Sequence, residues 1–102
     1  MRLAVELASL GADVVVVGST ARMLRDGGRE PRDLDVVVDA VDVDPLVAAL
    51  RRLGLHVPAL RLLRCRDVHL STGWGPLDVF VGAPPDAFEV RADGVRLSVV
   101  SA

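Results

Sequence analysis

Two short apolar runs joined by a polar segment constrain the fold of this chain more than any other feature. Val14 to Val17 is a continuous β-branched run that ends at Gly18, the pattern of a strand buried on both faces. A helix of about two turns is expected next, over Ala21 to Asp26, with a serine or threonine as its N-cap. A second apolar run starts at Asp33. Residues 14–39 therefore predict a strand, a helix and a second strand.

The second strand carries carboxylates on one face. Because strand side chains alternate, the apolar residues at 34, 36 and 38 point one way, whereas Asp33 and Asp35 share the other face. Asp39 shares that face and is given no role. Two such carboxylates repel each other, and a cation between them relieves the repulsion. Mg²⁺ suits this site because it binds a few carboxylate oxygens together with water and substrate phosphates.

The Asp pair needs support from elsewhere in the chain. Eleven of the 102 residues are Asp, so about one Asp-x-Asp pair is expected by chance in this chain. Asp42 and Asp44 form a second such pair, in which Asp44 is interpreted as the N-cap of a helix.

Asp78 supplies a third carboxylate. It interrupts the apolar run from Leu77 to Val81, where packing favours a neutral side chain. A metal ligand explains it, and the alternative is an edge strand whose Asp faces water.

The other elements follow from the same periodicities. The sequence predicts helices over Arg2–Leu10 and Leu46–Leu53, strands over Ala59–Cys65, Val68–Thr72 and Leu77–Val81 with a turn at Gly73–Pro76, and a hairpin over Phe88–Val100 that turns at Ala92–Gly94. The predicted class is α+β, a mixed β-sheet with flanking helices in the order helix, strand, helix, strand, helix and then β meander. Residues 1–102 are expected to form one domain.

Composition excludes several classes of function. The net charge of −2 predicts no broad nucleic-acid-binding face, and the absence of Lys excludes a Walker A phosphate loop. Cys65 has no second cysteine to pair with, and the chain shows neither a signal-peptide layout nor an apolar run long enough to span a membrane. A location in a reducing cytoplasm is expected.

The Gly18-Ser19 turn is a candidate phosphate site. Free backbone N–H groups and the positive end of the helix dipole attract anions where a strand runs into a helix, and glycine lets phosphate approach closely. Ser19 adds a hydroxyl donor, and Arg22 lies one turn further on. The alternatives are a simple N-cap for Ser19 and a solvated surface side chain for Arg22.

Together, the Gly18-Ser19 turn, Asp33-Leu34-Asp35 and a later strand bearing Asp78 resemble the nucleotidyltransferase fold of the DNA polymerase β superfamily. The stretches TGWGPLDVFVG and DGVRLSVVS are similar to bacterial nucleotidyltransferase-like domains of toxin–antitoxin and abortive-infection systems. The resemblance covers nearly the whole chain, although each motif is short.

The resemblance implies a role for each matching residue. Gly18 and Ser19 would hold the triphosphate of an NTP, Asp33 and Asp35 would ligate Mg²⁺, and Asp78 would bind the metal at the attacking hydroxyl of an RNA or protein acceptor and assist its deprotonation. The family usually continues into helices that bind the base and the acceptor. Since this sequence stops at Ala102, that half is expected to be missing or supplied by a partner protein. The alternative is a non-catalytic, antitoxin-like or partner-binding domain of the same fold.

Other residues are weaker candidates. His56 and His69 have no second ligand at metal-binding spacing, which argues against a zinc site. Cys65 is interpreted as a structural thiol. Trp74 is expected to pack in its turn or to stack on a base.

Overall fold

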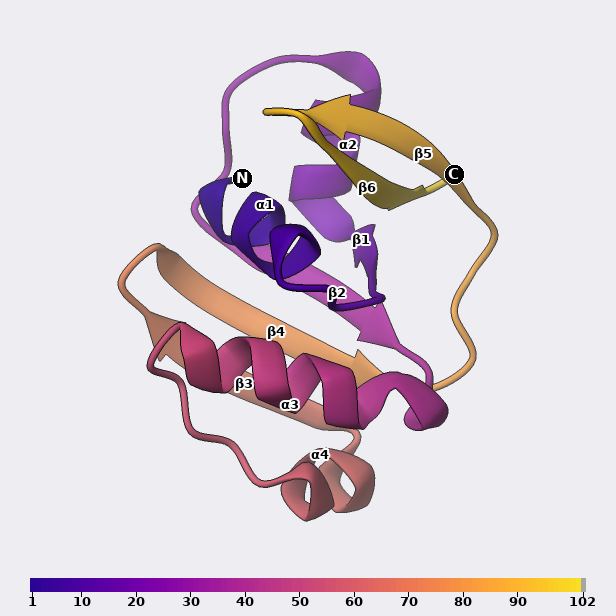
Figure 1. Ribbon diagram of the computed structural model, residues 1–102. Helices are drawn as coiled ribbons and strands as arrows, with labels where there is room; N and C mark the ends of the chain where they lie inside the picture. The colour runs from indigo at the N-terminus through magenta and orange to yellow at the C-terminus, as the bar shows by residue number, and fades with distance from the viewer. Residues whose placement is uncertain (102) are drawn as a thin grey trace.

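The computed structural model describes residues 1–101, which form a mixed sheet flanked by helices (Figure 1). The helices are α1 (Arg2–Ser9), α2 (Gly18–Asp26), α3 (Val43–Arg52) and α4 (Ala59–Cys65), with a 3₁₀ helix η1 (Ala40–Asp42) before α3. The strands are β1 (Val15–Val17), β2 (Leu34–Val38), β3 (Asp67–Thr72), β4 (Gly75–Val81), β5 (Ala87–Ala92) and β6 (Val95–Val100). The predicted α+β class is confirmed.

The sheet grows outwards on both sides of the central β1–β2 pair. Its order is β3-β4-β2-β1-β6-β5, with β1 antiparallel to β2, and with β2–β4 and β1–β6 parallel. The β3–β4 and β5–β6 hairpins therefore lie at opposite ends of the sheet (Figure 1). The expected β meander is wrong, because its first strand, Ala59–Cys65, is helix α4, and only the β3–β4 hairpin remains of it. The parallel β2–β4 pair needs a crossover, which α3 and α4 provide.

The core lies on one face of this sheet. Alternate residues of β2 and β4 point into it, and Val36 and Val79 are completely buried there. Leu7 of α1 and Leu50 of α3 are also completely buried in this core, and the two helices lie across the same side of the sheet (Figure 1). The opposite face keeps side chains such as Asp35 only partly buried.

The segment Ala59–Cys65 forms helix α4, so the predicted strand there is wrong. The sequence ALRLLRC consists mainly of strong helix formers, and Pro58 precedes it in an extended conformation as the N-cap. Ala59 and Leu62 are three residues apart and share the buried side of the helix, whereas Leu60 is exposed. Packing against α3 and β3 therefore selects the helical period over the alternating one.

Two helices begin earlier than predicted. α2 begins at Gly18 instead of Ala21, with Val17 as its N-cap and no side-chain capping bond. Neither Ser19 nor Thr20 is therefore the N-cap. α3 begins at Val43, which places Asp44 inside its first turn and makes the predicted capping role of that residue wrong.

A carboxylate that was given no role in the sequence interpretation has a local one in the structure. Asp39 ends β2 and precedes the 3₁₀ helix, where its Oδ1 accepts a hydrogen bond from the Val41 N–H at 3.1 Å. Asp39 therefore acts as the N-cap that turns the chain from β2 towards α3.

The two hairpins have tight turns. Asp93 and Gly94 form the β5–β6 turn with φ angles of 50° and 79°, and the predicted Asp-Gly turn is confirmed. The β3–β4 turn is shorter than expected: Thr72 pairs with Gly75, which leaves only Gly73 and Trp74 in the loop.

Candidate functional site

Asp35 and Asp78 lie directly opposite each other in the sheet. The parallel register of β2 and β4 pairs these two residues, and both point away from the face that holds Val36 and Val79. β4 lies between β3 and β2, so the edge-strand alternative for Asp78 is wrong. The Asp78 side chain is only 27% exposed. Two carboxylates from distant parts of the sequence thus share one partly sheltered place.

The charge at this place is unbalanced. Burial raises the pKa of the Asp35 carboxyl above its ordinary value, and a hydrogen bond to Asp78 and the negative charges of Asp78, Asp33 and Asp67 raise that pKa further. Each of these causes disfavours the ionised form of Asp35. A cation or a proton between the two carboxyl groups would offset this charge.

Gly18 brings the start of α2 against the same carboxylate. Val17 pairs with Asp35 across β1 and β2, so the chain enters α2 beside Asp35. A Cβ atom on Gly18 would lie 2.5 Å from Asp35 Oδ2, and the residue has a φ of 68°. Only glycine fits here without displacing the carboxylate. The first backbone N–H groups of α2, which have no partner within the helix, begin at this turn.

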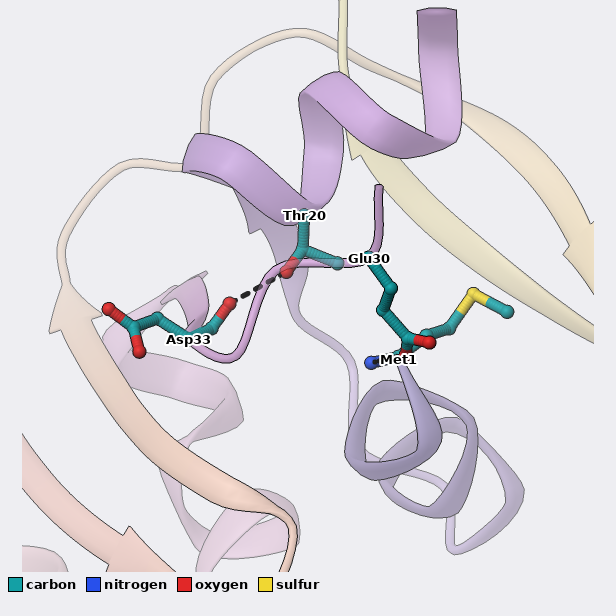
Figure 2. Close-up of polar contacts among 4 residues, drawn as sticks. All are labelled: Met1, Thr20, Glu30 and Asp33. Carbon is teal, nitrogen blue, oxygen red and sulfur yellow. Dashed lines mark hydrogen bonds and ion pairs between the residues drawn. The ribbon is translucent and has the colours of Figure 1, made fainter. Parts of the chain in front are cut away.

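Thr20 joins the beginning of α2 to the residue that precedes β2. Its side chain is 1% exposed, and its hydroxyl donates a hydrogen bond of 2.7 Å to the main-chain carbonyl of Asp33. The Asp33 carboxylate points away from this bond (Figure 2). The Met1 amino group forms an ion pair of 2.7 Å with Glu30, which lies in the loop between α2 and β2 (Figure 2). The start of α2 and the main chain at Asp33 are therefore held together by a partly buried hydrogen bond.

The predicted site residues differ in how closely they approach Asp35 and Asp78. Asp33 is exposed and acts on Asp35 through its charge. Ser19 and Arg22 are exposed on α2, and within residues 1–101 neither forms a hydrogen bond or an ion pair with Asp35 or Asp78. The structure thus brings Gly18, Asp35 and Asp78 together, and the roles of all six residues stay predictions.

His69 is the side chain that the sequence interpretation missed. Its Nδ1 lies 2.7 Å from Asp78 Oδ1, because the β3–β4 register places the two residues opposite each other. The turn length was the signal that could have found it. A loop from Gly73 to Pro76 would pair Ser71 with Asp78, whereas the two-residue loop pairs His69 with it.

The donor set fits a hard cation in its chemistry. Asp35 and Asp78 offer carboxylate oxygens, which Mg²⁺ prefers. Burial and then the nearby negative charges raise the pKa of Asp35, and a cation would offset those charges. Across residues 1–101, however, no three His, Cys, Asp or Glu side chains are arranged as a ready-made metal-binding group. A shallow pocket of about 220 Å³ lies elsewhere, lined by Arg51, His56, Val57 and Pro58.

Comparison with protein-family models, with curated proteins and with solved structures found no match to this chain. The described part of the chain contains no helix with the length and apolar character needed to cross a membrane.

Proposed function

We propose that this chain is a Mg²⁺-dependent nucleotidyltransferase-like domain that binds an NTP and transfers a nucleotidyl group to a hydroxyl group of an RNA or a protein. One observation carries the proposal: Asp35 and Asp78 stand opposite each other on β2 and β4, and the Gly18 turn closes on Asp35. A phosphate-binding turn beside paired carboxylates is suited to phosphoryl chemistry. A reducing cytoplasm is the proposed location.

Different residues of the chain would bind the triphosphate and the metal. The backbone N–H groups at Gly18 and Ser19 would bind the triphosphate, with Arg22 adding positive charge one turn further on. Asp33, Asp35 and Asp78 would hold the metal. When bound, Mg²⁺ supplies positive charge that stabilises the phosphate oxygens and the attacking oxygen.

The reaction exchanges one phosphorus–oxygen bond for another. The acceptor hydroxyl oxygen forms a bond to the α-phosphorus, the bond from that phosphorus to the β-phosphate bridging oxygen breaks, and pyrophosphate leaves. The proton of the hydroxyl passes to the Asp78 carboxylate. His69 holds that carboxylate at 2.7 Å, on the side of β4 opposite to β2.

Thermal unfolding tests the proposal. An NTP at about 100 times its dissociation constant should stabilise the fold by about 2.7 kcal/mol, a rise of several degrees in melting temperature, and only when Mg²⁺ is present. Asp35→Asn should abolish the shift. Asp86→Asn, which removes one exposed carboxylate from the loop before β5, should keep it. The absence of a Mg²⁺-dependent shift with all four common NTPs would rule out the proposal for this chain.

The second candidate is a non-catalytic, antitoxin-like domain of the same fold that binds a partner protein. The lack of a ready-made metal-binding group within residues 1–101 favours it. The same titration separates the two candidates, because a non-catalytic domain without a nucleotide site would show no shift in any variant.

A further inference from the structure

Strand β5 leaves one edge of the sheet open. It pairs with β6 on one side and is the last strand of the sheet on the other. Its pairing with β6 is continuous from Ala87 to Ala92 without a bulge, and the strand contains no proline. Bulges and prolines are two of the usual means of protecting such an edge. β5 has neither, so its backbone can accept another strand where the charges of its side chains are matched.

The hairpin geometry shows which backbone groups face outwards. Because the Asp93-Gly94 turn has two residues, Ala92 and Val95 form a hydrogen-bonded pair, and such pairs alternate along an antiparallel ladder. The N–H and C=O groups of Ala87, Glu89 and Arg91 consequently point towards the open edge. A strand added along the middle of β5 must pair with Glu89 and Arg91.

The side chains of β5 divide between the two faces of the sheet. Phe88, Val90 and Ala92 lie on the core face, where Val90 and Ala92 pack against the core and Phe88 is left 43% exposed. Glu89 and Arg91 are exposed on the other face.

The charges of β5 are poorly satisfied within one chain. The β5–β6 register places Arg91 opposite Arg96, two like charges facing each other. Glu89 reaches the same Arg96 only at 4.0 Å. A neighbour that offers a carboxylate to Arg91 and a cation to Glu89 would relieve both.

We propose that β5 pairs in an antiparallel manner with β5 of a second copy of this chain, with Val90 opposite the partner's Val90. Glu89 then lies opposite the partner's Arg91 on both sides of the two-fold axis. Phe88 lies opposite the partner's Ala92, which extends the apolar face from one core to the next.

Neighbouring registers are disfavoured because they pair like charges or because they place the core faces of the two copies on opposite sides of the sheet. A shift of the centre by one residue in either direction places Glu89 opposite Glu89 or Arg91 opposite Arg91, which are repulsive pairs. If the two-fold axis passes between two residues, each core-facing residue of one copy lies opposite a solvent-facing residue of the other. The core faces of the two copies then lie on opposite sides of the joined sheet. Among the registers centred on Glu89, Val90 or Arg91, only the one centred on Val90 satisfies both conditions, and it alone pairs Glu89 with Arg91 twice.

The dimer goes beyond the proposed function and does not depend on it. β5 stands at the opposite end of the sheet from β3 and β4, so the Asp35–Asp78 pair stays open in both copies. One strand pair buries less surface than stable interfaces do, so a dissociation constant of about 1–100 µM is expected.

Charge reversal tests the register. Sedimentation of the full chain from about 1 µM to about 1 mM should show a monomer–dimer equilibrium. Glu89→Arg alone or Arg91→Glu alone should each weaken the dimer about tenfold or more, because each turns two attractive pairs into repulsive ones. The double variant should restore the wild-type affinity, and an equal mixture of the two single variants should form a mixed dimer. Arg29→Glu, on an exposed loop, should leave the equilibrium unchanged.

Amide hydrogen exchange on the wild-type chain tests the same edge without any substitution. The amides of Glu89 and Arg91 should exchange at least threefold more slowly at the highest concentration than at the lowest, whereas those of Phe88 and Val90 should change less. A chain that stays monomeric, a double variant without restored affinity, or a dimer that leaves the Glu89 and Arg91 amides unprotected would each overturn the proposal.

Discussion

Gly18 is the residue at which backbone and carboxylate meet. Its φ of 68° is unfavourable for any residue with a side chain, and a Cβ atom there would lie 2.5 Å from Asp35 Oδ2. Gly54 has a similar φ of 84°, but a Cβ atom at that position would meet nothing within 4 Å. The two glycines therefore separate the cost of the backbone conformation from the cost of the contact.

Substitution by alanine should affect these two sites unequally. Gly54→Ala is expected to lower the free energy of unfolding by about 1 kcal/mol, the cost of a left-handed conformation. Gly18→Ala should lower it by about 2–4 kcal/mol, because the Asp35 carboxylate must also move. Urea unfolding measures both values. Equal losses would show that Gly18 is required for its backbone angle alone.

Helix α4 is the element in which helical and alternating patterns compete. In a helix Leu62 points inwards and Leu60 outwards, whereas in a strand both would share one face. The structure leaves Leu62 completely buried and Leu60 55% exposed. The two leucines therefore report on the type of element.

Truncation of each leucine tests this assignment. Leu62→Ala should lower the free energy of unfolding by about 2–5 kcal/mol, since it leaves a cavity in the core. Leu60→Ala should change it by less than about 0.5 kcal/mol. Urea unfolding of both variants is the measurement. Similar losses for the two would contradict the helix and support a strand.

At the scale of the whole molecule, the sheet brings carboxylates from different strands close to Asp35. Burial raises the pKa of Asp35 above its ordinary value of 3.8, and nearby carboxylates raise it further. These carboxylates belong to Asp78 in β4, Asp67 in β3 and Asp33, which precedes β2. The folded state therefore holds a proton on Asp35 more tightly than the unfolded state does. The stability that this proton contributes is complete below about pH 3.8 and is lost as the pH rises through the folded-state pKa.

Asp35→Asn should remove this dependence. The variant is expected to gain stability relative to the wild type as the pH rises, and to unfold at a higher temperature than the wild type at neutral pH without divalent cations. Melting temperatures from about pH 3 to about pH 8 measure the difference. Asp86→Asn serves as the control and should show no such trend. A difference that is constant or falls with pH would contradict the assignment.

Much of the fold was predictable from local pattern. β1, β2, α1 and the body of α3 follow from runs of apolar residues with one clear period, and the β5–β6 turn follows from Asp93-Gly94. The start of α2 was misplaced because the Thr20 hydroxyl bonds to the Asp33 carbonyl and does not cap its own helix. The start of α3 was misplaced because Val43, its first residue, is buried in the core.

The sequence by itself determined the class of the fold and the residues of the Asp-rich strand, because alternation and turn chemistry are local properties of the chain. Only the tertiary structure decided that α4 is a helix, that β4 crosses to lie parallel to β2, and that His69 faces Asp78. Those outcomes depend on strand order and register, which are set by burial of surfaces distant in sequence. The pairing of Asp35 with Asp78, on which the proposed function rests, belongs to that second group.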